Sequence, residues 1–294
     1  MKVPPMLFVL FVCQALAAAQ QPSVAQHPLR RQYSEGQKLA YHMKGVNESW
    51  HYEIDAEGIV KKDSSGRFFE EFRWTNMISD GHPVSLAPSA IAYRQKLTLD
   101  PAQNPSAPDL KDADPKMIGP ITDLMTFYAD LWLPSKLGVL RKAGDHFYFH
   151  NFMPPSSWAD GKRVLVGEDA IDFDMTFKSL DPASSTAQIE IKHVPPQKQA
   201  LPLKADWMKE PVASAQNNWI EITRNSDGKY EAGVGLETFA VELNVSTTDG
   251  HIVSATMDNP VNTVERICED ESLAKCSEPK RHEILRRIEI TQKP

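Results

Sequence analysis

The clearest alternation of apolar and polar side chains in this sequence is Ile171-Asp-Phe-Asp-Met-Thr-Phe-Lys178. In an extended strand, successive side chains point to opposite faces, so this segment has one apolar face and one polar face. Such a segment is typical of an antiparallel sheet that covers a core on one side and contacts water on the other. The fold class therefore depends on how often this pattern recurs.

The same alternation recurs from the beginning of the chain to its end. It occurs in Leu39–Met43, Trp50–Ala56, Ile91–Leu99, Phe239–Val245 and Ile284–Ile290. Turn-forming residues separate these runs, and about a dozen strand-like segments at short spacing favour an antiparallel arrangement over alternating strands and helices. The sequence thus predicts a mainly β (α+β) fold, a curved antiparallel sheet or half-barrel, in a single domain over residues 35–294.

One segment, near residues 120–133, has helical spacing instead. Its apolar positions follow the i, i+3, i+4, i+7, i+8 rule: Leu124, Phe127, Tyr128, Leu131 and Trp132. Pro120 suits the start of a helix and Pro134 its end, so we predict one main helix here. Proline-rich loops are predicted at 101–116 and 195–211, because proline cannot donate a ladder hydrogen bond.

Residues 1–19 have the pattern of a secretory signal peptide. Lys2 precedes an apolar run, and Ala17-Ala18-Ala19 supplies small residues for cleavage. The apolar run is shorter than the roughly 20 residues that span a membrane, so we expect no transmembrane anchor after cleavage. Residues 20–34 lack apolar periodicity and are predicted to be a flexible linker. The predicted location is secreted or periplasmic.

The composition excludes one class of partner and predicts a disulfide. The 294 residues include 32 Lys and Arg against 39 Asp and Glu, a formal net charge of −7. This balance argues against nucleic-acid binding, which needs a basic face. The two cysteines beyond the signal, Cys268 and Cys276, are predicted to pair and to stabilise the fold by about 2.5 kcal/mol. A zinc site with His282 is the alternative, but it lacks a fourth ligand.

The segment 145–160 contains the best candidates for catalysis. His146, Tyr148 and His150 occupy alternate positions and are expected to share one face of a strand. His146, His150 and Asp160 are the candidates for an uncatalogued hydrolase, although no nucleophile and base can be paired. Nearby acidic residues are either calcium ligands or the polar face of a strand; they are Glu168, Asp169, Asp172 and Asp174. We assign no catalytic residue, no metal site and no cofactor.

Both ends of the predicted domain resemble known sequences. The opening Tyr33-Ser-Glu-Gly-Gln-Lys-Leu-Ala-Tyr41, the strand Phe239–Val245 with its Asp249-Gly250 turn, and the closing Ile288-Glu-Ile290 are similar to several uncharacterised secreted bacterial families. Those families are similar in turn to envelope lipoprotein carriers. The resemblance implies an open half-barrel closed by helices. It is a pattern of spacing and assigns no functional residue.

The aromatic helix among alternating strands leads to a prediction of function. If the sheet curves around the helix, a gap between them forms a cavity for an apolar or amphipathic molecule such as a lipid. The predicted ligand-binding residues are Leu124, Phe127, Tyr128, Leu131 and Trp132. Two alternatives remain: a structural or partner-binding β domain whose core these side chains fill, and the hydrolase of residues 145–160. Ligand identity and oligomeric state are left open.

Overall fold

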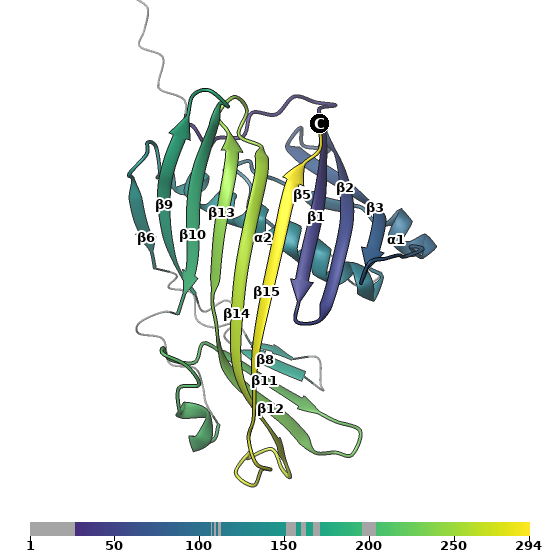
Figure 1. Cartoon of the computed structure of the whole chain (residues 1–294), viewed down its shortest axis with the longest axis vertical. Helices are drawn as coiled ribbons and strands as arrows, with labels where there is room; N and C mark the ends of the chain where they lie inside the picture. The colour runs from purple at the N-terminus through teal and green to yellow at the C-terminus, as the bar shows by residue number, and fades with distance from the viewer. Residues whose placement is uncertain are drawn as a thin grey trace, which may run out of the picture.

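The computed structural model describes residues 27–106, 108, 110, 113–150, 157–159, 163–166, 171–195 and 204–294. Within these residues, fifteen strands form one sheet in which paired strands run antiparallel, and one 20-residue helix lies across one face of it (Figure 1). The predicted fold class, a mainly β curved antiparallel sheet with one main helix, is confirmed. The predicted signal peptide lies outside the described residues.

The strands are distributed along the whole described chain. They are β1 (Lys38–Asn47), β2 (Trp50–Lys62), β3 (Phe68–Ser79), β4 (His82–Pro83), β5 (Gln95–Leu97), β6 (His146–Phe149), β7 (Ser157–Ala159), β8 (Arg163–Val166), β9 (Asp172–Asp181), β10 (Thr186–Val194), β11 (Trp219–Arg224), β12 (Tyr230–Glu237), β13 (Phe239–Ser246), β14 (Ile252–Cys268) and β15 (Lys280–Gln292). The helices are α1 (Pro88–Ala92), η1 (Pro115–Met117), α2 (Ile118–Leu137) and η2 (Asp206–Lys209).

The sheet divides into two branches at β14. One side of the sheet runs β4-β3-β2-β1-β15-β14, with β5 also paired to β3. On the other side, the half Ile252–Asp258 of β14 pairs with β13, and the half Val261–Cys268 pairs with β12. The upper branch continues through β13, β10, β9 and β6, and the lower branch through β12, β11, β8 and β7. The branches separate toward the bottom of Figure 1.

Pro260 lies where the two branches part. Proline has no N–H to donate, so a position without a full ladder partner is where a strand tolerates it. Its carbonyl oxygen accepts a 3.3 Å hydrogen bond from the N–H of Thr238, the single residue between β12 and β13. On its other side β14 stays in unbroken register with β15 from Ser254 to Glu265. The division therefore affects only the edge of β14 that pairs with β13 and β12, and leaves its pairing with β15 unchanged.

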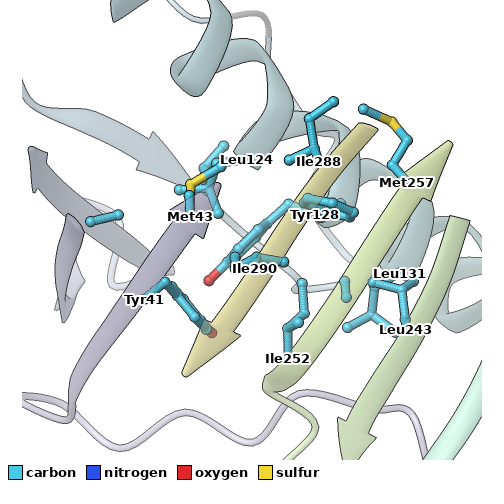
Figure 2. Close-up of a cluster of buried hydrophobic side chains, with 14 of the residues drawn as sticks. Tyr41, Met43, Leu124, Tyr128, Leu131, Leu243, Ile252, Met257, Ile288 and Ile290 are labelled. Carbon is cyan, nitrogen blue, oxygen red and sulfur yellow. The ribbon is translucent and has the colours of Figure 1, made fainter. Parts of the chain in front are cut away.

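The main core lies between the concave face of the sheet and α2. Figure 2 shows Tyr41, Met43 and Ile288 on the strands facing Leu124 and Tyr128 of the helix. All five side chains are at most 2% exposed. Burying each large apolar side chain stabilises the fold by about 1.5–3 kcal/mol, so this layer holds helix and sheet together.

A second core covers the opposite face of the sheet in the lower branch. In the upper half of β14 the odd-numbered Ala255 and Met257 are buried, whereas beyond Pro260 the even-numbered Val264 joins a separate cluster with Ile222. Met208 of η2 is fully buried in that cluster. Because the register with β15 does not slip, the side chains keep their alternation and only the covered face changes.

Helix α2 is longer at both ends than the predicted 120–133. Pro120 lies in its first turn, where an N–H has no intrahelical partner. The prediction that Pro134 ends the helix is wrong: the helix continues to Leu137, because proline at this position removes only one backbone hydrogen bond. The helix ends at Gly138, whose φ of 67° is left-handed and whose N–H bonds the carbonyl of Ser135.

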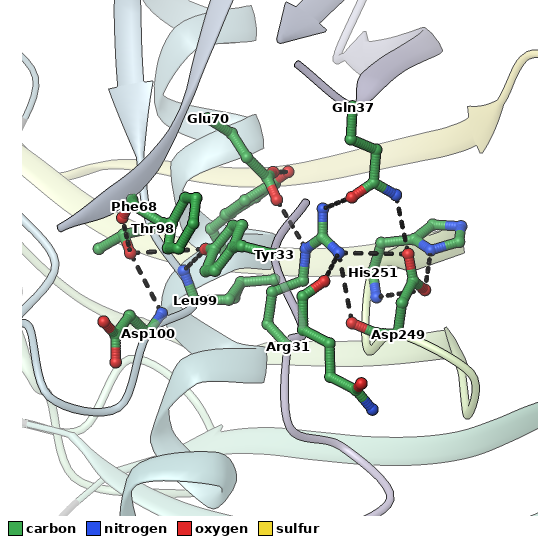
Figure 3. Close-up of polar contacts among 12 residues, drawn as sticks. Arg31, Tyr33, Gln37, Phe68, Glu70, Thr98, Leu99, Asp100, Asp249 and His251 are labelled. Carbon is green, nitrogen blue, oxygen red and sulfur yellow. Dashed lines mark hydrogen bonds and ion pairs between the residues drawn. The ribbon is translucent and has the colours of Figure 1, made fainter. Parts of the chain in front are cut away.

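The segment before β1 corrects the prediction of a linker through residue 34. Leu29 is 1% exposed and the Arg31 side chain is fully buried, so the chain from Leu29 onward belongs to the domain. Arg31 Nε lies 2.8 Å from a carboxylate oxygen of Glu70 on β3, which is also fully buried (Figure 3). Tyr128 of α2 donates its hydroxyl to the same carboxylate. Three elements thus meet at one buried charge.

The same arginine also reaches the turn between β13 and β14. Its guanidinium donates to Gln37 Oε1 at 3.0 Å and to Asp249 Oδ2 at 3.2 Å. Gly250, at φ 75°, lies directly against Arg30: a Cβ there would come within 2.6 Å of the Arg30 carbonyl. Glycine at this position lets the segment cross the turn. We call this set of contacts around Arg31 the N-terminal clasp.

The predicted disulfide is confirmed, and short helices occur in the described parts of the two predicted proline-rich loops. Cys268 and Cys276 are bonded, which excludes both sulfurs from the alternative zinc site. In the predicted loop 195–211, the described part contains η2, and residues 196–203 lie outside the described residues. In the loop 101–116, η1 begins at Pro115.

Replacing Leu124 with alanine tests the helix-to-sheet core. We expect Leu124→Ala to lower the free energy of unfolding by about 2–5 kcal/mol, because a fully buried side chain leaves a cavity. Leu137→Ala, at the exposed end of the same helix, is the control and costs less than about 1 kcal/mol. Urea unfolding measures both. Equal losses in the two variants would contradict the packing described here.

Replacing Arg31 with alanine tests the N-terminal clasp. The variant leaves Glu70 buried without its cation, so we expect a loss of about 3–5 kcal/mol in urea unfolding. Arg30→Ala removes the same charge from the exposed neighbouring position and serves as the control, with an effect within about 0.5 kcal/mol. A loss in Arg31→Ala no larger than in the control would show that the segment is not anchored.

A pH dependence follows from His251, whose ring contacts Asp249 and Gln292. Burial alone would lower the pKa of His251, and Arg31 acts in the same direction, but the hydrogen bonds to Asp249 and Gln292 and the charge of Asp249 outweigh both and raise it above 6.5. Protonated His251 therefore stabilises the folded state fully below about pH 6.5, and this stabilisation is lost as the pH rises through the folded-state pKa of His251.

We expect the wild type to lose more stability than His251→Gln between about pH 6 and pH 9. Urea unfolding at both pH values checks this, and the difference between the proteins isolates His251 from the other histidines. Parallel pH profiles would refute the contribution of His251.

Candidate functional site

The five predicted ligand-binding residues lie along α2. Leu124, Phe127, Tyr128 and Leu131 are at most 2% exposed. Figure 2 shows Leu124, Tyr128 and Leu131 beside the strands of the sheet. Trp132 is half-buried, and its Nε1 donates to the carbonyl oxygen of Gln103 at 2.7 Å. The face of the helix toward the sheet is thus in packed contact, while Met125 and Tyr128 also line a pocket of about 320 Å³ beside the loop at residues 103–106. A role for these residues as ligand contacts stays a prediction, and two further pockets lie at the ends of the helix.

A pocket of about 220 Å³ opens where the concave face passes the N-terminal end of α2. We call it the helix-end pocket. Its apolar wall consists of Val46, Trp50, Val261, Ile284 and Ile288. Its polar side consists of Asn47, Tyr52, Asp123, Glu237, Asn259 and Arg286. The pocket therefore joins an apolar surface to a set of charged and amide groups.

Strand alternation places these groups on the concave face. On β15, Ile284, Arg286 and Ile288 occupy every second position, so Arg286 lies on the same face as the buried Ile288. On β2, Trp50 and Tyr52 share a face in the same way. Because α2 begins near this point, it does not cover the part of the concave face that carries Ile284 and Arg286. The pocket occupies that uncovered part of the face.

A buried carboxylate anchors the polar side of the pocket. The Asp123 side chain is 1% exposed, accepts a 2.5 Å hydrogen bond from the Tyr52 hydroxyl and pairs with the Arg286 guanidinium. Burial raises the pKa of Tyr52, so its hydroxyl keeps the proton that it donates. Burial lowers the pKa of Arg286 from its high ordinary value, with Tyr52 acting in the opposite direction, and the guanidinium remains charged at neutral pH.

Asn259 supplies a buried acceptor that has no partner. Its Nδ2 donates to Glu237 Oε1 at 3.1 Å and to the Thr238 carbonyl at 2.9 Å. Both contacts need a donor, which fixes the orientation of the amide. The Oδ1 atom is buried and accepts no hydrogen bond from any described residue. A ligand hydroxyl or ammonium group in the pocket would satisfy it, since an unpaired buried acceptor is costly.

The structure brings the histidines of the 145–160 segment onto one face, as predicted. His146 Nε2 lies 2.5 Å from Asp174, and His150 Nδ1 lies 3.1 Å from Asp172. Tyr148 also donates to Asp172, and burial together with the neighbouring negative charge raises the pKa of Tyr148 to about 12. Asp172 and Asp174 thus hold side chains of β6 and of His150, the residue that follows it.

The hydrolase alternative and the predicted acidic cluster also include residues outside the described part of the chain. Asp160 of the hydrolase alternative lies outside the described residues, as do Glu168 and Asp169 of the acidic cluster. In the described ranges, no group of three or more His, Cys, Asp and Glu residues is arranged to hold a metal ion. The helices in the same ranges include none that is long and apolar enough to cross a membrane.

The sequence contains one signal for the helix-end pocket. Arg286 interrupts the apolar face of the run Ile284–Ile290 at the position where an isoleucine would continue it. A charge on a face that is otherwise buried must find a partner or reach water. Asn259 gives no comparable signal, because its partners Glu237 and Thr238 come from another strand and the turn beside it.

Comparison of the sequence with protein-family models and with curated proteins returns no match. The resemblance to secreted bacterial families and envelope carriers therefore stays a prediction from sequence spacing. The argument for function depends on the geometry of the site.

Proposed function

We propose that this protein is a non-enzymatic extracytoplasmic binding protein, and that it holds one end of an amphipathic molecule in the helix-end pocket. The observation that carries the proposal is that Asn259, whose buried Oδ1 has no partner among the described residues, lines a pocket whose other wall is apolar. An amphipathic molecule satisfies both sides, because its polar end can donate to Asn259 while its apolar part covers Trp50 and Ile284.

The charges of the pocket favour a donor or a cation. Asp123 and Glu237 carry two negative charges against the single positive charge of Arg286. The aromatic ring of Trp50 adds a face on which an ammonium group can lie. The volume of 220 Å³ corresponds to about seven water molecules, which suits a short apolar segment next to the polar end.

Two features support an extracytoplasmic location as part of this proposal. The Cys268–Cys276 disulfide is compatible with an oxidising compartment. Residues 1–19 carry the sequence pattern of a signal peptide. Together they favour secretion or periplasmic residence.

A second candidate function is a structural or partner-binding β domain with a filled core. The observation in its favour is the near-complete burial of Leu124, Phe127 and Leu131 against the sheet. Native mass spectrometry of the gently purified protein, followed by organic extraction, discriminates the two. A stoichiometric amphipathic molecule supports the binding protein, and a clean mass without one supports the filled-core domain.

The pocket is tested directly with octylamine as the probe. We expect saturable binding by isothermal titration calorimetry, and weaker binding of octanoate, whose polar end cannot donate to Asn259. Ile284→Phe fills the pocket and should weaken octylamine binding about tenfold or more. Leu285→Phe, on the opposite and exposed face of the same strand, is the matched control and should bind like the wild type.

Either of two outcomes would reject the site. One is octylamine binding that Ile284→Phe and Leu285→Phe change equally, and the other is the absence of saturable binding to a wild type whose circular dichroism shows a folded protein.

A further inference from the structure

A second pocket, of about 770 Å³, lies at the opposite end of α2. It is formed by the N-terminal segment at residues 27–30, the loop at residues 100–102 and the helix end at residues 135–141. We call it the basic pocket. It shares no lining residue with the helix-end pocket, so the argument below does not depend on the proposed function.

Unpaired positive charge is concentrated around the basic pocket. Arg30, Lys136 and Arg141 line it, and none of the three forms an ion pair with an acidic side chain in the described part of the chain. Asp100 is the one acidic residue among those lining it. Its carboxylate is directed to its own loop, where it accepts from the N–H of Ala102 at 2.9 Å and from Gln103 at 3.1 Å.

This arrangement differs from the charge of the chain as a whole, which is −7. The C-terminal end of α2 contributes roughly half a negative charge at its last carbonyls, but Gly138 and Val139 already donate to those carbonyls. Three cations against Asp100 and this partial charge leave the pocket positive. The pKa of His27 is lowered by burial, in spite of its bond to Val139, and the positive charges of Arg141 and Arg30 lower it further.

The basic pocket also contains an unsatisfied hydroxyl. Ser135 lines it, and its Oγ is buried with no hydrogen-bond partner among the described residues. A serine in a helix commonly donates to the carbonyl four residues earlier. The absence of that bond leaves a donor for a ligand oxygen.

The N-terminal clasp and the helix end hold the lining groups in place. Arg31 is fixed by Glu70, so the adjacent Arg30 has a fixed backbone position (Figure 3). On the opposite wall, Arg141 Nε donates to the carbonyl of Gly138 at 2.9 Å. His27 joins the two walls through a 2.7 Å hydrogen bond to the carbonyl of Val139. Such preorganisation reduces the entropy lost on binding.

We propose that the basic pocket binds the phosphate group of a phosphorylated molecule. Two guanidinium groups and an ammonium group match a doubly charged oxyanion better than a single carboxylate, because guanidinium donates two parallel hydrogen bonds to phosphate oxygens. The volume exceeds that of the phosphate alone and leaves room for the organic part that carries it. That part belongs either to a soluble phosphoester or to a phospholipid headgroup.

The test follows the His27 ring signals by NMR during titration with inorganic phosphate and with glycerol 3-phosphate. We expect saturable shifts, and an affinity about tenfold or more weaker in the Arg30→Ala/Arg141→Ala variant. Arg94→Ala/Lys142→Ala removes the same net charge from exposed positions outside the pocket and is the matched control, with unchanged affinity. Both replaced arginines are exposed, so the test variant is expected to fold.

Vesicles distinguish the two sources of the phosphate group. Sedimentation with phosphatidylglycerol vesicles but not with phosphatidylcholine vesicles, lost in Arg30→Ala/Arg141→Ala, assigns the pocket to a lipid headgroup. Binding of glycerol 3-phosphate without sedimentation assigns it to a soluble phosphoester. The proposal is overturned if neither phosphate probe gives saturable shifts, or if the control variant weakens binding as much as the pocket variant.

Discussion

The carboxylate of Glu70 is the group on which most of the tertiary arrangement depends. A fully buried carboxylate costs several kcal/mol unless a cation and hydrogen-bond donors surround it. Glu70 lies on β3, its cation Arg31 comes from the N-terminal segment, and a further donor, Tyr128, comes from α2. The segment, sheet and helix must therefore meet for any of them to be stable, and this meeting fixes the place of α2 across the sheet.

The two ends of α2 acquire different chemistry from the same packing. At the N-terminal end, the helix stops short of the lower branch and leaves part of the concave face beside Arg286 uncovered. At the C-terminal end, the clasp brings Arg30 beside Arg141. In the middle of the helix Phe127 is fully buried, and Met125 and Tyr128 line a further pocket of about 320 Å³ beside the loop at residues 103–106. The charged linings of the two pockets thus lie at the helix ends, whereas the buried polar groups along its middle are paired, as Tyr128 is with Glu70 and Asp130 with His193.

Period-two and helical spacing were sufficient to predict the antiparallel sheet and the main helix, because both depend on local sequence. Pro134 misled the prediction of the helix end: the left-handed Gly138 ends the helix, and proline costs it only one hydrogen bond. The anchoring of Arg31 could not be predicted, since Glu70 and Asp249 are distant in sequence and a short polar segment has no periodicity. The pocket of Asn259 depends on strand pairing across the Pro260 division, which alternation does not encode.

The division of the sheet at Pro260 has a consequence for the order in which the protein opens. The two cores lie on opposite faces, and β14 is the described strand that contributes residues to both, while its pairing with β15 runs along both halves. Loss of the small lower core leaves the larger core intact, whereas loss of the upper core removes the strands on which β12 assembles. Opening is therefore hierarchical: the lower branch is a separate cooperative unit of lower local stability, and its amides exchange with solvent before those of the strands beneath α2.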